Sequence, residues 1–303
     1  MKINRRLQNI SLIAVAGLAF IGLILGTFLD RQITNRMGDY DNVFGIAFTA
    51  LGPILTLAFG VFAGATLFFM PKIKNKTWDI VFRVIGAFAI IGFVFAQIKE
   101  GKAYADPEFL VMQKERSTWI ALIIVLISLI DLAIVLFTKI WIKKMDTKVL
   151  IQVCLMIIAI IVIYFVVCEA IKYMASRPRP RVLDQGRLYF KQWYEWKPFA
   201  AFKEEYDDCK SFVSGHAANA GCLVTILPLI ATLNKRENNE MIQILTSVIG
   251  ALFVFVVAFS RIIAKAHWLS DVMGGILVSC GIQALVINLT PYILKKTEKP
   301  AEE

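Results

Sequence analysis

Histidine is scarce in this chain, because only two histidines, His216 and His267, occur among 303 residues. The five cysteines show no paired framework and none of the close Cys and His spacings of a metal site, which excludes a disulfide scaffold and a zinc module. Alternating, strand-like hydrophobicity is absent as well, which excludes a membrane β-barrel. We therefore predict no metal site, and we interpret the cysteines as small apolar fillers.

Long apolar runs dominate what is present. Hydrophobic residues make up 58% of the chain, against roughly 45–50% in a typical soluble domain. Eight runs are long enough to cross a hydrocarbon layer of ~30 Å. They cover about 10–29, 46–70, 80–98, 118–138, 149–171, 217–233, 242–260 and 272–293. The sequence thus predicts an all-α polytopic membrane bundle of about eight transmembrane helices.

The net charge of +10 could indicate a nucleic-acid partner, but the distribution of the charge argues against one. Basic residues gather in every second connection, as the positive-inside rule requires of cytoplasmic loops. These residues are Lys2, Arg5, Arg6, Lys72, Lys74, Lys76, Lys139, Lys143, Lys144, Lys148, Lys235, Arg236, Lys295, Lys296 and Lys299. The opposite connections, about 30–41 and 99–116, mix both signs. We expect an integral protein of a bacterial cell membrane with both termini in the cytoplasm, and the sequence does not indicate its oligomeric state.

The first of three polar segments on the expected outer side follows the fifth apolar run. Lys172 precedes Arg179-Pro180 by seven residues. Because Pro178 and Pro180 oppose helix continuation, the helix is predicted to end near Ser176, with Arg179 folding back toward Lys172. Alternatively, the basic residues of this segment only anchor the end of a span at the membrane boundary, namely Lys172, Arg177, Arg179 and Arg181.

The second polar segment, Ser214-Gly215-His216, comes directly before the sixth apolar run. It is predicted to form the N-terminal turn of that helix, where free N–H groups and the helix dipole attract anions. The Ser214 hydroxyl can serve as an N-cap or as a donor to phosphate. Capping would explain the serine but not the histidine.

The third polar segment contains Ser260-Arg261, His267 and Asp271. His267 and Asp271 are four residues apart, one helical turn, so the carboxylate could orient one imidazole nitrogen and leave the other for a substrate. Arg261 is suited to bidentate phosphate binding. The alternative is a structural Arg–Asp or His–Asp pair buried in the bundle, but ionisable groups at membrane depth are costly and usually functional.

The longest connection, about 181–213, interleaves aromatic and basic side chains. This composition is typical of the membrane–water boundary, so the segment could form a lid or a lipid-entry rim beside the site. An ordinary packed loop whose aromatic rings cover helix ends is the alternative.

At these residues the chain resembles the phosphatidic-acid-phosphatase type 2 family, whose three motifs are K-x6-RP, PSGH and SR-x5-H-x3-D. The first and third motifs match fully, while the second has Val213 in place of the usual proline. Lys265 and Leu269 stand where the family is expected to have glycine and proline. The motifs span residues 172–271. The family's core has six helices, so the resemblance implies two additional N-terminal helices. We accordingly divide the chain into N-terminal helices, 1–100, and a catalytic core, 101–303, which together form one continuous domain.

The resemblance implies a metal-free lipid phosphatase without a cofactor. His267 would attack phosphorus and form a phosphohistidine, Asp271 would fix its tautomer, and His216 would protonate the leaving oxygen. The phosphate would be bound by Lys172, Arg179, Ser214, Gly215 and Arg261. The expected partner is a lipid phosphate in the bilayer, such as a polyprenyl diphosphate, phosphatidylglycerol phosphate or phosphatidic acid, reached from the extracytoplasmic face. Two alternatives are a lipid phosphotransferase and a non-catalytic lipid transporter or binding protein.

Overall fold

The protein is an all-α bundle in the computed structural model, which describes residues 4–40, 42–101, 116–142, 145–184, 186, 188–197, 207–233 and 239–297. The long helices are α1 (Arg5–Met37), α2 (Val43–Phe69), α3 (Lys76–Gly101), α4 (Arg116–Trp141), α5 (Thr147–Ala175), α9 (Asn239–Ile263) and α10 (Leu269–Thr297). The shorter ones are α6 (Pro180–Asp184), a 3₁₀ turn (Asp207–Cys209), α7 (Gly215–Gly221) and α8 (Leu223–Ala231). Each predicted apolar run corresponds to helical structure, so the prediction of a polytopic helical bundle is confirmed.

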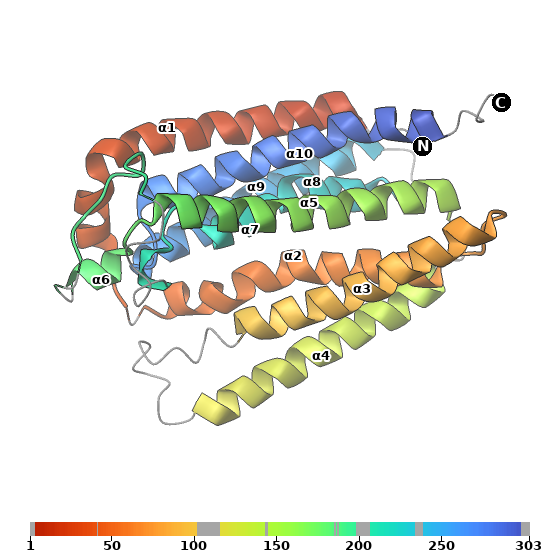
Figure 1. Cartoon of the computed structure of the whole chain (residues 1–303), viewed down its shortest axis with the longest axis horizontal. Coiled ribbons are helices and arrows are strands. Elements are labelled where there is room, and N and C mark those ends of the chain that lie inside the picture. Colours follow the sequence, from red (N-terminus) through yellow and green to blue (C-terminus); the bar gives the residue numbers. More distant parts are fainter. Residues whose placement is uncertain are drawn as a thin grey trace.

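The long helices lie roughly along one axis and alternate in direction, with α7 and α8 together forming the antiparallel segment between α5 and α9 (Figure 1). Seven of them are long and apolar enough to cross a membrane. The sixth predicted run is shorter, because α7 and α8 together cover only Gly215–Ala231 and are divided at Cys222. The beginning of α1 and the end of α10 lie at the same end of the bundle, while α6 and the start of α7 lie at the opposite end (Figure 1).

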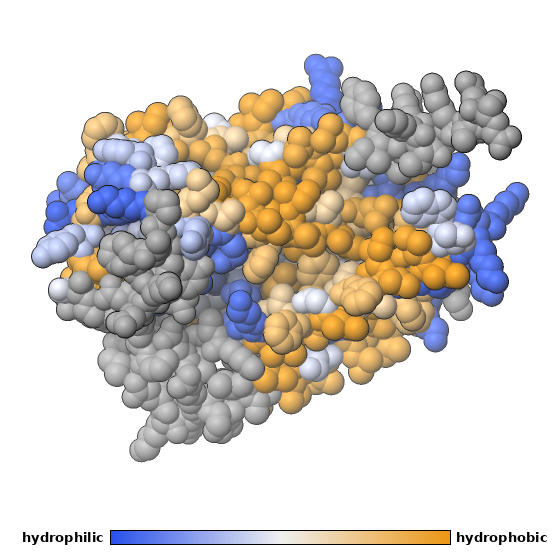
Figure 2. Space-filling model, in the orientation of Figure 1, coloured by the Kyte–Doolittle hydropathy of each residue, from blue (hydrophilic) through white to orange (hydrophobic). Residues whose placement is uncertain are grey.

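The surface of the bundle fits an integral membrane protein. Figure 2 shows an apolar band across the middle of the visible face and hydrophilic residues toward both ends. Large apolar side chains on the outer helices are exposed, such as Phe88 and Phe95 on α3 and Ile140 on α4. Exposed rings and branched chains are stable in lipid, where they would be unfavourable in water.

Helix α1 packs along α10 with a close backbone approach at Gly26. A Cβ atom at Gly26 would lie only 2.7 Å from the backbone nitrogen of Ser270, so only glycine allows this separation. Asp30 follows one helical turn later on the same face of α1. The N-terminal helix thereby brings a carboxylate to the first turn of α10, beside the third polar segment.

The end of α5 agrees with the sequence prediction. The helix stops at Ala175, and Ser176 adopts a left-handed conformation with φ of 42° while its N–H donates to the carbonyl of Lys172. Pro178 and Pro180 follow and prevent the chain from continuing as α5. The reversal returns Arg179 toward the end of α5.

Candidate active site

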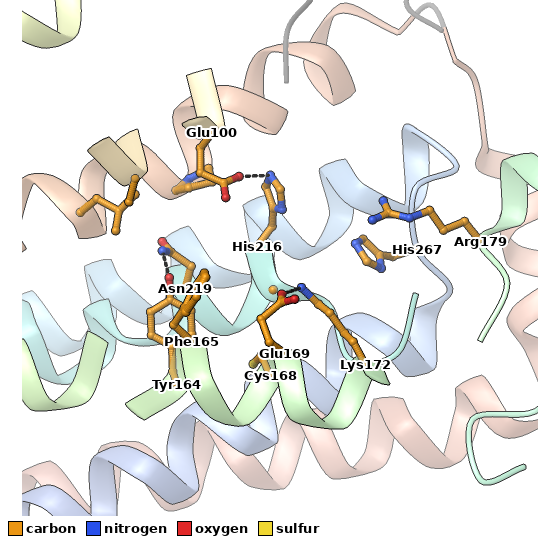
Figure 3. Close-up of a pocket in the computed structure, with 14 residues that line it drawn as sticks. Glu100, Tyr164, Phe165, Cys168, Glu169, Lys172, Arg179, His216, Asn219 and His267 are labelled. Carbon is orange, nitrogen blue, oxygen red and sulfur yellow. Dashed lines mark hydrogen bonds and ion pairs between the residues drawn. The ribbon is translucent and has the colours of Figure 1, made fainter. Parts of the chain in front are cut away.

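A cavity of about 180 Å³ lies near the end of the bundle that holds α6 and the start of α7. Five of the eight predicted site residues line it, and they come from segments far apart in the sequence. These residues are Lys172, Arg179, Gly215, His216 and His267. In Figure 3 the guanidinium group of Arg179 points toward the ring of His267, and the ammonium group of Lys172 lies between the two histidines. The fold thus gathers two cations and two imidazoles around one small space.

The other three predicted residues are buried behind the wall of this cavity. Ser214 is fully buried and caps α7, because its side chain accepts from the backbone N–H of Ala217. Arg261 is 3% exposed and donates from Nη1 to the hydroxyl of Thr49, while its Nε has no partner among the described residues. The prediction that Ser214-Gly215-His216 opens a helix is therefore confirmed, and of the two roles considered for Ser214 the structure shows the N-cap.

His267 lies in the turn between α9 and α10 and is 2% exposed. Its Nδ1 is 2.9 Å from the carbonyl oxygen of Ser211. Since a carbonyl can only accept, Nδ1 carries the proton, and Nε2 keeps the lone pair that a nucleophile needs. Burial is the largest cause that holds the pKa of His267 well below its ordinary value, and the charges of Arg179 and Arg261 act in the same direction. A neutral, nucleophilic imidazole follows from this position.

Asp271 touches His267 less directly than the four-residue spacing suggests. Its Oδ2 is 3.8 Å from Nδ1 of His267, which is an ion-pair distance rather than a hydrogen bond. The carboxylate accepts instead from the hydroxyl of Ser211, from the backbone N–H of Trp268 at 2.8 Å and from Arg177 at 2.5 Å. The physical reason is that His267 precedes α10, so the two residues do not face each other across a complete helical turn. Asp271 organises the turn around His267, and its catalytic role stays a prediction.

A buried arginine joins this turn to the N-terminal helix. Arg177 is 1% exposed and lies between two carboxylates, with Nη2 at 2.8 Å from Asp30 and Nη1 at 2.5 Å from Asp271. Its guanidinium group also faces the rings of Phe190 and Trp268, with centroid distances of 5.5 and 5.6 Å. Asp30 additionally accepts from the backbone N–H and the hydroxyl of Ser270. This cluster places two carboxyl groups and one guanidinium group beside His267.

His216 is held from outside the three motifs. Its Nε2 lies 2.8 Å from the carbonyl oxygen of Thr49 on α2 and 4.0 Å from a carboxylate oxygen of Glu100 on α3 (Figure 3). Thr49 thereby contacts both His216 and Arg261, through different atoms. Helix α2 sets the position of the imidazole and of the buried guanidinium together.

Gly215 lets the cation on α5 approach the start of α7. A Cβ atom at this position would lie 3.0 Å from Nζ of Lys172, closer than ordinary van der Waals contact. The same ammonium group pairs with Glu169 at 2.6 Å, three residues earlier on α5. The absence of a side chain at 215 and the pairing with Glu169 fix the place of Lys172 in the cavity.

The departures from the family's motifs leave the cavity lining intact. Lys265 has a left-handed backbone, with φ of 49°, at the position where glycine was expected. Its ammonium group points away to Asp184, at 2.7 Å, and lies over the ring of Tyr40. Burial raises the pKa of Asp184, but the hydrogen bonds from Lys265 and Tyr40 outweigh this effect and hold the pKa below its ordinary value. Val213 is buried beside α10 and does not line the cavity.

The described part of the long connection, 188–197, packs on the bundle. Trp193 donates from its indole nitrogen to the hydroxyl of Thr27 on α1 at 3.0 Å, and Phe190 packs edge-on against Trp268. Tyr189, in contrast, is 92% exposed. These contacts agree with the packed-loop alternative, and the lid stays a prediction. Residues 185, 187 and 198–206 of this connection, and the whole connection between α3 and α4, 102–115, lie outside the described residues.

Sequence reasoning missed the residues that support the site, namely Asp30, Thr49, Glu100, Glu169, Arg177 and Ser211. Asp30 and Glu100 were assigned only to the sign balance of loops, and Arg177 only to membrane anchoring. A usable signal existed for Arg177, because it is a second arginine between Lys172 and Pro180, in addition to the Arg179 of the motif. Thr49 and Ser211 gave no signal, because each contacts a histidine of the site through its backbone carbonyl, a group that every residue possesses.

Two imidazoles together with one lysine and one arginine cation in a small cavity form a site suited to a tetrahedral anion and to phosphoryl transfer. Among the described residues, no group of three or more His, Cys, Asp or Glu side chains is arranged to hold a metal ion.

Comparison with known proteins agrees with this chemistry. The family model described as PAP2 superfamily matches residues 148–295, from the start of α5 to the last turns of α10. No curated protein and no solved structure matches the chain significantly. The match to this superfamily supports, in general terms, a hydrolase of lipid phosphate esters. Residues 148–295 of this chain, which contain all three polar segments, match the PAP2 superfamily.

Proposed function

We propose that this protein is a metal-independent phosphatase that removes phosphate from a lipid phosphate or diphosphate through a phosphohistidine intermediate. One observation carries the proposal: Lys172, Arg179, His216 and His267 come from three separate polar segments and line a single cavity. A structural ion pair would need neither two histidines nor an unfilled space between them.

The geometry assigns each group a part in the reaction. Nε2 of His267 attacks phosphorus, while Nδ1 stays bound to the Ser211 carbonyl. Lys172 and Arg179 neutralise the phosphoryl oxygens in the cavity, and His216 donates a proton to the departing oxygen. Because phosphoryl transfer needs little covalent assistance, positioned charges of this kind supply most of the stabilisation.

Arg261, Gly215 and Ser214 support the phosphate from the wall of the cavity. Arg261 donates to the hydroxyl of Thr49, whose backbone carbonyl contacts His216. The Nε atom of Arg261 lacks a partner among the described residues. A bound phosphate oxygen would supply the missing acceptor after a small side-chain movement. Gly215 offers its backbone N–H at the start of α7, and Ser214 holds that turn in shape.

We further propose that the site faces the extracytoplasmic side. The site lies at the opposite end of the bundle from the beginning of α1 and the end of α10 (Figure 1). The sequence predicts that the basic connections lie at the same end as the two termini, which is the cytoplasmic side by the positive-inside rule. An outward site suits recycling of a carrier lipid, so a polyprenyl diphosphate is the favoured substrate, ahead of phosphatidylglycerol phosphate and phosphatidic acid.

The test is phosphate release by the purified protein in detergent from these three lipids, with and without a chelator. We expect release that the chelator does not change. His267→Ala should abolish release while the protein keeps its melting temperature, and acid-labile phosphate should be trapped on the wild-type protein but not on this variant. Full activity of His267→Ala, or inhibition by the chelator, contradicts the mechanism.

The same assay separates the alternatives. A lipid phosphotransferase would consume substrate without releasing an equal amount of inorganic phosphate. A transporter or binding protein would move or bind the lipid and leave it chemically unchanged. Quantitative recovery of phosphate from consumed substrate therefore supports the hydrolase alone.

A further inference from the structure

Glu100, at the end of α3, is a charged residue of the cavity that belongs to none of the three motifs. It lies outside residues 148–295, yet its carboxylate oxygen Oε2 is 4.0 Å from Nε2 of His216. Figure 3 shows the two side chains pointing toward each other from different helices across the edge of the cavity. A carboxylate is unexpected in a site that binds phosphate, because like charges repel. Its position therefore needs a reason other than substrate binding.

The hydrogen bonds of His216 define which nitrogen exchanges a proton. Nε2 lies 2.8 Å from the carbonyl oxygen of Thr49, so this nitrogen carries a proton in the neutral ring. The proton that can be given to a substrate is then the one on Nδ1. A ring with protons on both nitrogens is positively charged, and Glu100 is placed to stabilise that form through Nε2.

The rest of the cavity opposes a charged His216. Lys172, Arg179 and His267 line the same space, and Arg261 contacts the same Thr49 as His216 does. Each positive charge disfavours a further one. Glu169, the other carboxylate of the lining, is engaged by Lys172 at 2.6 Å. Among the described residues of the lining, Glu100 is thus the carboxylate that pairs with His216.

We propose that Glu100 is a positioning residue that favours the protonated form of His216 in its role as general acid. The proposal rests on the proposed phosphatase function. As Nε2 of His267 forms a bond to phosphorus, the bond from phosphorus to the lipid oxygen breaks, and the proton on Nδ1 of His216 moves to that oxygen. Water then attacks phosphorus, returns a proton to Nδ1 and breaks the nitrogen–phosphorus bond, which releases phosphate. Glu100 takes no proton in either step.

The test compares pH profiles of kcat/KM for the full-length wild type, Glu100→Gln and Asp184→Asn. Two probes are used, dioctanoyl phosphatidic acid, whose alcohol must be protonated to leave, and p-nitrophenyl phosphate, whose phenolate leaves unaided. Glu100→Gln should move the alkaline limb to lower pH by about one unit, because an opposite charge within 4–6 Å typically shifts a pKa by 1–3 units and Glu100 is partly exposed. The rate loss should be larger for phosphatidic acid than for p-nitrophenyl phosphate.

Asp184→Asn is the matched control, since it removes one negative charge from a more exposed pair with Lys265, and it should leave the alkaline limb in place. Glu100→Asp keeps the charge and should retain most of the wild-type profile, which guards against a loss caused by misfolding. An unchanged alkaline limb in an active Glu100→Gln protein, or equal losses on both probes, overturns the role of Glu100 and leaves the phosphatase intact. A wild type that releases phosphate from neither probe overturns the phosphatase proposal and this one with it.

Discussion

Removal of Asp30 should destabilise the protein more than removal of any exposed carboxylate. Arg177 is 1% exposed and is compensated by Asp30 and Asp271. Asp30→Ala leaves Arg177 with one partner and removes the acceptor of the backbone N–H and hydroxyl of Ser270. Removing one partner of a buried ion pair costs about 3–5 kcal/mol of stability. The Ser270 groups that lose their acceptor belong to the same network, so their cost is not added to that of the broken ion pair. At roughly 2 °C per kcal/mol for a large chain, the melting temperature should fall by about 6–10 °C.

The cysteines provide the assay for this prediction. All five are free and buried, so a thiol-reactive fluorogenic maleimide will report unfolding as they become accessible on heating in detergent. Asp184→Ala is the control, because its pair with Lys265 is partly exposed and such pairs contribute about 0–1 kcal/mol. If Asp30→Ala melts no earlier than Asp184→Ala, the buried cluster does not stabilise the junction of α1 and α10, and the reasoning is refuted.

Three further predictions concern the cavity and its neighbouring turn. The acid limb of the kcat/KM profile should lie below pH 6.5, because burial and nearby cations lower the pKa of His267. The ring therefore stays neutral as the pH falls through the ordinary pKa of histidine. An acid limb above pH 6.5, after correction for substrate ionisation, would contradict this prediction. Gly215→Ala should reduce kcat/KM by about 10- to 100-fold at an unchanged melting temperature, because the new Cβ displaces the ammonium group of Lys172. Gly221→Ala is the comparison, because its new Cβ meets the side chain of Ser279 and not Lys172. Lys265→Gly should be more stable than Lys265→Ala by about 1 kcal/mol, since a left-handed backbone disfavours any Cβ; equal thermal stability of the two variants would argue against strain at this turn.

The sequence was sufficient for the fold class and for five of the residues that line the cavity, because both depend on patterns that one chain displays. Apolar length identifies spans regardless of how they pack, and the end of α5 near Ser176 followed from two prolines with fixed backbone angles. The three polar segments were predicted to meet because few other uses explain charged groups beside membrane spans. The boundary at residue 100 between N-terminal helices and catalytic core stays a prediction.

The supporting contacts could not be predicted, because they depend on tertiary packing between helices. Asp30 reaches Ser270 only because Gly26 allows α1 to approach α10 closely, and nothing in the local sequence of either helix indicates the other. The partner of Nδ1 in His267 is a backbone carbonyl, which every residue possesses and which no side-chain pattern reveals. The four-residue spacing suggested Asp271 instead, because it assumed that His267 lies within the helix, whereas α10 begins two residues later, at Leu269.

The contribution of α1, α2 and α3 to the site has a practical consequence for recombinant work. A truncated fragment limited to the family-matched stretch would keep both imidazoles but lose the α1 counter-ion of Arg177 and the carbonyl that orients His216. A chimera that grafts this stretch onto the leading helices of a PAP2 superfamily protein would meet the same deficit unless positions 30, 49 and 100 were transplanted with it. Exchange of catalytic modules therefore has to treat these leading helices as structural components of the enzyme rather than as an interchangeable membrane anchor.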